Sequence, residues 1–210
     1  MIRFVAVLAL LALAQPACAQ PELVRRGEAV QLMVHGKPFL ILGGELSNSA
    51  ASSPAYMAPV WPKLRAMNLN TVLAPVSWQL IEPSEGHFKY SSVDALLTGA
   101  RRNHLHLVLL WFGAWKNSMS SYVPSWVRRG EARFPRAMLP NGSGEEILSA
   151  FSPAVLDADR RAFTALLRHL KAVDAQAETM VMVQVENEIG MLPTPLQQTS
   201  TMELSTTRCI

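Results

Sequence analysis

Four apolar runs of strand length alternate with helical patterns along this chain of 210 residues. In chain order, the runs cover residues 37–45, 70–76, 106–112 and 179–185. Such alternation is typical of parallel strands joined by right-handed helical crossovers. The last run is almost continuously apolar and rich in Val and Met, which predicts a strand buried on both faces of a sheet. The sequence therefore predicts an α/β fold built on a parallel sheet.

Three amphipathic patterns separate the runs and predict helices. The first begins at Ser53-Pro54 and is expected to be irregular, or to start later, because Pro59 and Pro62 interrupt it. We expect Ser92 to cap the second helix and Ser152-Pro153 to begin the third. The apolar residues at helical spacing are, in order, Trp61, Leu64 and Met67; Val93, Leu96, Leu97 and Ala100; and Phe163, Leu166, Leu167 and Leu170.

Residues 113–152 join the third run to the third helix and have no clear period beyond a short turn near residues 123–129. Connections of this length are usually functional or disordered. Trp115, Tyr122 and Trp126 argue against disorder, because disordered segments tend to lack aromatic residues. We therefore expect a functional loop.

Four parallel strands could form half of an eight-stranded barrel or part of an open, doubly wound sheet. An open sheet that bound a dinucleotide would carry a glycine-rich phosphate loop after its first strand. Gly-Gly-Glu-Leu-Ser at residues 43–47 is not such a loop. The sequence therefore favours a partial (β/α)8 TIM barrel that comprises the first four β/α units. In a barrel the carboxyl ends of the strands converge on one face, where active sites lie.

Polar and aromatic residues follow all four predicted strands. Glu186, Asn187 and Glu188 come directly after the last run. Ionised carboxylates are costly to bury without partners, so this segment is expected where the strand leaves the core. A strand that simply stops in a polar turn is the alternative. The residues that follow the other strands are Glu45 and Asn48; Trp78 and Glu82; and Trp115, Lys116 and Asn117.

The start of the chain has the pattern of a secretory signal. Arg3 gives a positive start, residues 4–14 form an apolar run too short to span a bilayer, and Ala17-Cys18-Ala19 is a cleavage site. We expect export to the periplasm or the extracellular space, with a mature chain that begins near Gln20. Cys209 would then be the only cysteine, which excludes an internal disulfide.

Composition argues against several classes of partner. The formal net charge is +3 with 17% charged residues, which indicates neither nucleic acid nor an anionic membrane as the partner. The five histidines lack metal-ligand spacing, and the sequence has no phosphate-cradling loop and no Ser/His/Asp arrangement. We expect no metal and no cofactor.

With these residues in hand, the chain resembles the retaining β-glycosidases of the barrel clan A, most closely glycoside hydrolase family 35, the β-galactosidases. The resemblance covers roughly residues 34–192. The family usually has a His-Tyr pair where this chain has Ser47-Asn48, and a Pro-Gly-Pro-Tyr run followed by Ala-Glu in place of residues 112–117. The neighbouring family 42, with the same fold and chemistry, is therefore the alternative. The matching segments are Gly36-Lys37-Pro38-Phe39, Gly44-Glu45-Leu46, Leu69-Asn70-Thr71-Val72, Ile81-Glu82-Pro83, Glu85-Gly86-His87-Phe88, Pro124-Ser125-Trp126 and Gln184-Val185-Glu186-Asn187-Glu188.

The resemblance implies that Glu188 is the general acid/base of a retaining exo-β-galactosidase and that Asn187 contacts the 2-hydroxyl of the bound sugar. A retaining enzyme needs one carboxyl with a raised pKa and a second, the nucleophile, about 5–5.5 Å away. In the family the nucleophile ends the seventh strand, so we expect it to be absent from this chain. Glu186 is interpreted as a structural partner rather than a second catalytic carboxylate.

Further substrate-binding candidates follow the first three strands. For each tryptophan, core packing is the alternative role, and for each glutamate the alternative is an ion pair at the strand end. These candidates are Glu45, Trp78, Glu82, Trp115, Lys116 and Asn117.

The chain is therefore expected to comprise a signal peptide (residues 1–19), the N-terminal half of a glycoside hydrolase barrel (residues 20–192) and a polar tail unlike the family (residues 193–210). Four strands cannot close a barrel, so we expect this chain alone to aggregate or stay partly unfolded, without glycosidase activity. The expected partner is a carbohydrate with a terminal β-galactose. We expect no association with a membrane after signal cleavage. The alternatives are another clan A β-glycosidase, such as a β-glucanase or β-mannanase, and a vestigial, non-catalytic sugar-binding protein.

Overall fold

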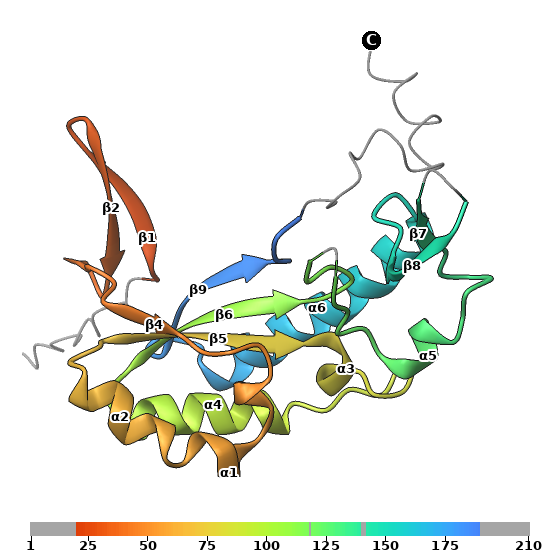
Figure 1. Cartoon of the computed structure of the whole chain (residues 1–210). Coiled ribbons are helices and arrows are strands. Elements are labelled where there is room, and N and C mark those ends of the chain that lie inside the picture. The colour runs from red at the N-terminus through yellow and green to blue at the C-terminus, as the bar shows by residue number, and fades with distance from the viewer. Residues whose placement is uncertain (1–19, 118, 140–141, 190–210) are drawn as a thin grey trace, which may run out of the picture.

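The computed structural model describes residues 20–117, 119–139 and 142–189, and a four-stranded parallel sheet lies at its centre (Figure 1). The strands neighbour one another in chain order, and β5 and β6 pair along their whole length. The predicted α/β fold with a parallel sheet is thus confirmed. The four strands are β4 (Gly43–Glu45), β5 (Thr71–Ser77), β6 (His106–Phe112) and β9 (Met180–Val185).

Three helices pack on the same face of this sheet. α2 (Val60–Ala66), α4 (Ser91–Arg102) and α6 (Pro153–Val173) bury apolar side chains against one side of β5 and β6 in a single core. The helices of a doubly wound sheet cover both faces, so this arrangement argues for a singly wound sheet. The core includes Trp61, Leu64, Leu96, Leu97, Leu166 and Leu170 from the helices and Val72, Val76, Leu107, Leu109 and Trp111 from the strands.

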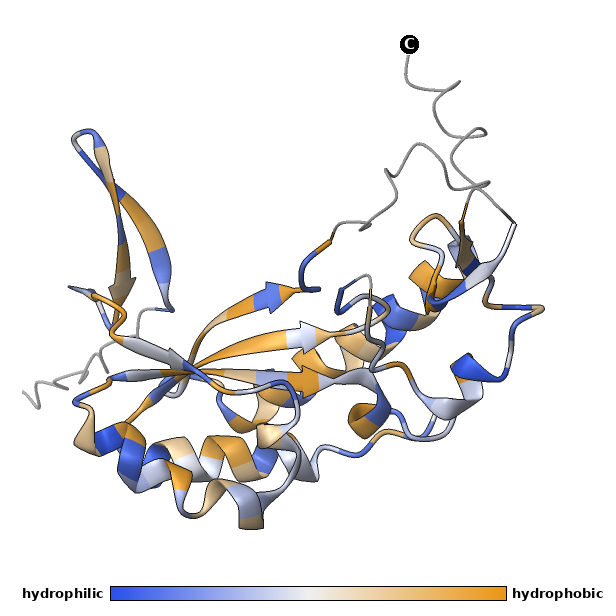
Figure 2. Ribbon diagram, viewed as in Figure 1, coloured by the Kyte–Doolittle hydropathy of each residue, from blue (hydrophilic) through white to orange (hydrophobic). Residues whose placement is uncertain are grey.

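The opposite face of the sheet is also apolar. Val108, Leu110 and Phe112 of β6 join Val181 of β9 and Val34 in a second core. Because successive side chains of β6 enter the two cores alternately, this strand is buried on both faces, as its continuous apolar run predicts. Figure 2 shows the same distribution, with β5, β6 and β9 largely hydrophobic.

A small antiparallel sheet near the chain start supplies Val34 to the second core and rises from the amino ends of the parallel strands (Figure 1). The sequence did not predict its hairpin, because most side chains of its first two strands are exposed and polar and apolar positions do not alternate cleanly. The strands of this sheet are β1 (Glu22–Arg26), β2 (Ala29–Val34) and β3 (Lys37–Pro38).

The predicted helix starts agree with the structure except at one cap. Ser53 caps α1 (Pro54–Met57) and Ser152 caps α6, each by accepting a hydrogen bond from a backbone N–H in the first turn. The break between α1 and α2 is the predicted irregularity. Ser92 is not a cap, because α4 already begins at Ser91.

The long connection before α6 contains more regular structure than predicted. The turn expected near residues 123–129 is the short helix α5, but the hairpin of β7 and β8 was not predicted. Both of its strands are short and their register is irregular, so neither produces a clear period in the sequence. The elements of this connection are α5 (Ser125–Arg128), β7 (Arg136–Met138) and β8 (Gly144–Leu148). Two further short helices lie earlier in the chain, η1 (Ala50–Ser52) and α3 (Trp78–Ile81).

β9 forms an edge of the described sheet, and this corrects the prediction of a strand buried on both faces. Val181 is buried, but Met182 is 40% exposed and Val185 is 62% exposed. Among the described strands β9 pairs only with β6, so its second half lacks a neighbour that would cover it.

Gly99 on α4 lets the indole ring of Trp61 pack directly against the helix. A Cβ at this position would overlap the ring atoms Cε2 and Cζ2 of Trp61. We expect Gly99→Ala to lower the free energy of unfolding by about 1–2 kcal/mol, because over-packing outweighs the gain in helix propensity. Urea denaturation measures the change, with the exposed Thr98→Ala as the matched control. Equal stability of the two variants would contradict this contact.

Several predictions concern residues outside the described ranges. These are the signal peptide at residues 1–19, the polar tail at residues 193–210, and Cys209. Within the described ranges, no helix has the length and apolar character needed to cross a bilayer. The same part of the chain contains no group of three or more His, Cys, Asp or Glu residues that could hold a metal ion.

Candidate active site at the carboxyl end of the sheet

The chain leaves β9 through a turn with two left-handed residues. Glu186 has a φ of 60° and Glu188 a φ of 38°, with Asn187 between them. Residues other than glycine rarely adopt positive φ, and holding one there costs of order 1–3 kcal/mol. Such a conformation persists only where the surroundings over-determine it, so the contacts of these three residues define the turn.

Hydrogen bonds tie this turn to the loop that follows β6. Asn187 Nδ2 donates to the carbonyl oxygen of Lys116 at 3.1 Å, and Trp115 Nε1 donates to the carbonyl oxygen of Glu188 at 3.0 Å. Lys116 Nζ lies 3.5 Å from Glu188 Oε1. The neighbouring strands β6 and β9 therefore end in one connected polar group. We call it the strand-end cluster, and its members are Trp115, Lys116, Asn117, Asn187 and Glu188.

Glu188 is the exposed member of the strand-end cluster, with 62% of its side chain accessible. A hydrogen bond with Asn117 and then the positive charge of Lys116 lower the pKa of Glu188. The carboxyl group is therefore ionised near neutral pH. The expected raised pKa is wrong for the described structure, because an exposed carboxylate is not desolvated while its two partners favour the charged form.

Lys116 supplies a charge that methionine can remove while keeping an unbranched side chain of nearly the same length. Its side chain is only 7% exposed, and Nζ lies 5.4 Å from the ring centroid of Phe112. We expect Lys116→Met to raise the pKa of Glu188 toward its ordinary value, because one of the groups that favour the ionised form is lost. A carbon-13 NMR titration of the Glu188 carboxyl group measures this pKa. The exposed Lys63→Met serves as the control, and an unchanged titration in Lys116→Met would refute the pairing.

Trp78 and Glu82 do not join the strand-end cluster. Trp78 is 0% exposed and Glu82 is 1% exposed, and Trp78 Nε1 donates to Glu82 Oε2 at 2.8 Å. Glu82 also accepts from the backbone N–H of Gly86 at 2.7 Å and, through its carbonyl oxygen, from Trp126 Nε1 at 3.0 Å. The structure therefore favours packing roles over sugar contact for both residues, which corrects their assignment as substrate-binding candidates.

Glu45 and the residues after β4 lie at the same end of the sheet. Glu45 is exposed at the last position of β4. A hollow of about 130 Å³ lies beyond it, lined by Asn48, Ser49, Ser77 and Tyr122 among others. Ser49 Oγ and Tyr122 Oη are 3.3 Å apart, which links the loops after β4 and β6. Glu45 remains a predicted site residue without a described contact to the strand-end cluster.

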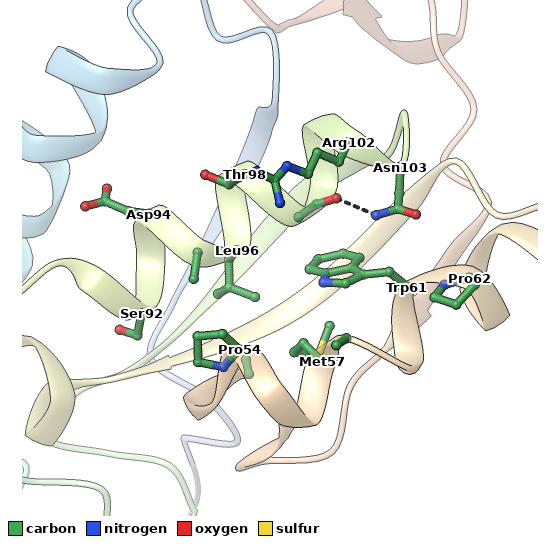
Figure 3. A pocket seen from close by; sticks show the side chains of 14 residues that line it. Pro54, Met57, Trp61, Pro62, Ser92, Asp94, Leu96, Thr98, Arg102 and Asn103 are labelled. Carbon is green, nitrogen blue, oxygen red and sulfur yellow. Dashed lines mark hydrogen bonds between the residues drawn. The ribbon is translucent and has the colours of Figure 1, made fainter.

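A second hollow, of about 500 Å³, lies between α1, α2 and α4 (Figure 3). Met57, Trp61, Leu96 and Arg102 are among its lining residues, and none of the predicted site residues lines it. It is therefore separate from the strand-end cluster.

Sequence reasoning missed one residue beside the turn, Asp159 of α6. Asp159 is 9% exposed and forms a hydrogen bond with Glu186. The signal was present in the sequence, because Asp159 stands four residues after Val155 on the apolar face of the helix. A carboxylate in that position requires a partner.

The parallel sheet and the Asn-Glu pair at the end of β9 indicate a protein related to the glycoside hydrolases. A sequence comparison agrees: a β-galactosidase from Xanthomonas manihotis is 30% identical over 192 residues, covering 86% of this chain and 29% of that protein. No family model matches the chain. The resemblance predicted from the motifs is thus confirmed at the level of glycoside hydrolases.

Two solved structures share the fold. A β-galactosidase from Bacillus circulans sp. alkalophilus has a TM-score of 0.57 at 16% identity, over 72% of this chain and 22% of that chain. The exo-β-1,4-mannosidase Op5Man5 from Opitutaceae bacterium strain TAV5 has a TM-score of 0.53 at 17% identity, over 75% of this chain and 26% of that chain. The chain spans less than a third of the length of each of these three proteins.

Proposed function

We propose that this chain forms the first four β/α units of a barrel that hydrolyses terminal β-galactosides with retention of configuration. The observation that carries the proposal is the strand-end cluster, in which Asn187 and Glu188 meet the loop after β6 at the carboxyl end of the sheet. Strand order in chain sequence and helices on one face both support a barrel. The 30% identity to a β-galactosidase supports the choice of sugar.

In this reaction Glu188 acts as the general acid and base. One carboxyl must protonate the leaving oxygen and later take a proton from water. The lowered pKa keeps Glu188 ionised, and the carboxylate is the form that the second step needs as its base. For the first step it must bind a proton, and a sugar that covers the exposed carboxylate would raise its pKa by removing water.

Asn187 would orient the sugar through its side-chain amide. Its Nδ2 already donates to Lys116 O and its Oδ1 accepts from Gln184 Nε2 at 2.7 Å, so the amide is held in one orientation. A fixed amide can strengthen its contact with the 2-hydroxyl as positive charge develops at the sugar ring. Glu186 is excluded as the nucleophile in this proposal, because its carboxyl group is hydrogen-bonded to Asp159 and to the backbone N–H of Trp115.

A chimera tests this function directly. Residues 20–189 would replace the matching segment of the Xanthomonas manihotis β-galactosidase, and the rest of that protein would have to supply the strands that the proposed barrel still needs. We expect the chimera to hydrolyse a nitrophenyl β-galactoside in preference to the β-glucoside and the β-mannoside. Preference for the mannoside would instead support the alternative of a different clan member. A soluble chimera without hydrolysis of any of the three would contradict the proposal.

A further inference from the structure

Two carboxyl groups lie together behind the turn that bears Glu188. Asp159 reaches toward the sheet from α6 and is 9% exposed. Glu186 extends from the end of β9 and is half-buried, and the two carboxyl groups are hydrogen-bonded to each other. The glycosidase mechanism proposed above uses neither of them.

Each carboxyl group also accepts a hydrogen bond from a donor on or just after β6. Trp111 Nε1 donates to Asp159 Oδ1 at 2.9 Å, and the backbone N–H of Trp115 donates to Glu186 Oε2 at 2.9 Å. The remaining oxygen of Glu186, Oε1, faces the same point as Asp159 Oδ1. A Cβ on Gly113 would lie 2.5 Å from Asp159 Oδ1 and 2.6 Å from Glu186 Oε1. Gly113 therefore leaves the space in which the two groups meet.

A pair in this arrangement holds one proton. Two ionised carboxylates in hydrogen-bond contact and away from water repel each other strongly, so one of them keeps its proton. Burial, together with the hydrogen bond to Asp159 and its charge, raises the pKa of Glu186 to about 10. Glu186 then donates to Asp159 through one oxygen and accepts from Trp115 through the other.

The pair is connected to Glu188 through Trp115. The carboxyl of Glu186 fixes the backbone of Trp115, and the indole Nε1 of Trp115 donates to the carbonyl oxygen of Glu188 at 3.0 Å. The path therefore runs from α6, through Glu186, to the loop after β6 and back to the turn. Both ends of the left-handed turn are held by this path.

We propose that Glu186 is a positioning residue that, through a proton shared with Asp159, holds the turn bearing Asn187 and Glu188 against the loop after β6. Its importance for hydrolysis rests on the proposed function, but the shared proton and the positioning of Trp115 do not. Of the charged groups described nearby, Asp159 faces Glu186 from α6. Lys116, in the loop after β6, is directed at Glu188, with Nζ 3.5 Å from its Oε1.

The shared proton makes stability depend on pH in a defined direction. In the unfolded chain Glu186 loses its proton above its ordinary value of 4.5, whereas in the folded chain it keeps the proton to about pH 10. Between these values the folded state binds more protons than the unfolded state, so the free energy of unfolding falls as pH rises. The contribution of the pair is complete below pH 4.5 and is lost progressively toward pH 10.

Glu186→Gln tests the proposal, because the amide keeps both hydrogen bonds without titrating. Its Nε2 can donate to Asp159 and its Oε1 can accept from Trp115. We expect the proton uptake on folding, measured from the pH dependence of urea unfolding of the full chain, to fall by about one proton. Glu178→Gln, at the opposite end of β9, is the matched control and should leave the uptake unchanged.

The indole N–H resonance of Trp115 in nitrogen-15 NMR spectra supplies a readout of position. We expect Glu186→Gln to leave it near its parental shift and Glu186→Ala to move it, because only alanine releases the backbone of Trp115. A pH dependence unchanged by Glu186→Gln would overturn the shared proton. A Trp115 resonance unchanged by Glu186→Ala would overturn the positioning role. Neither readout uses hydrolysis, so an inactive chimera would count against the proposed function and leave this result standing.

Discussion

Glu188→Gln in the chimera is expected to lower kcat for a nitrophenyl β-galactoside by about 100- to 10,000-fold, the usual contribution of a general acid–base group. The substitution should slow mainly the second step of the reaction, the hydrolysis of the glycosyl-enzyme. Nitrophenolate leaves without much help from an acid, whereas the attack of water on the glycosyl-enzyme needs a base. Steady-state kinetics with the purified variant measure the change.

Azide distinguishes a lost base from a misfolded protein. As an anion it attacks the intermediate without a base, so added azide should restore turnover of Glu188→Gln and yield a galactosyl azide. Glu178→Gln, an exposed position just before the start of β9, should retain parental activity. If Glu188→Gln kept most of its activity, Glu188 would not be the acid/base.

Gly113→Ala is expected to lower the free energy of unfolding by about 3 kcal/mol or more, at the upper end of single substitutions in a packed core. The added methyl group would overlap Trp111 Nε1 and lie 2.5 Å from Asp159 Oδ1 and 2.6 Å from Glu186 Oε1. It would therefore force apart the three groups that form one hydrogen-bonded unit. Urea denaturation of the full chain measures the loss.

Gly144→Ala is the matched control for this substitution. The nearest atom to a Cβ at Gly144 is 3.6 Å away, an ordinary contact distance, so we expect little change in stability. Gly113→Ala with the same stability as Gly144→Ala would mean that the carboxyl pair can move apart at little cost. That result would also weaken the inference drawn for Glu186.

The parallel sheet could be predicted from the sequence because its strands lie in a nearly continuous apolar context. The run at residues 106–112 coincides with β6, since a strand buried on both faces must be apolar at every position. The hairpin of β1 and β2 could not be predicted in this way. Its burial is confined largely to Met33 and Val34, so tertiary packing rather than a sequence period determines it.

The site was predictable where residues follow a strand and less so where burial decides their role. Trp115, Lys116, Asn117, Asn187 and Glu188 meet because β6 and β9 are neighbours in a parallel sheet. Trp78 also follows a strand, but α3 turns it into the core, where it bonds to Glu82. Asp159 lies on a helix far from the motif in sequence, and only the packing of α6 under the sheet brings it to Glu186.

The order of the strands in the sheet has a consequence for how the protein assembles. Each of β5, β6 and β9 pairs with the strand that precedes it in the parallel sheet. During synthesis, every new strand therefore leaves the ribosome after its template already exists, and the sheet can grow in one direction as translation proceeds. Asn187 and Glu188 follow the last strand of this series, so the proposed chemistry becomes organised only after the scaffold beneath it.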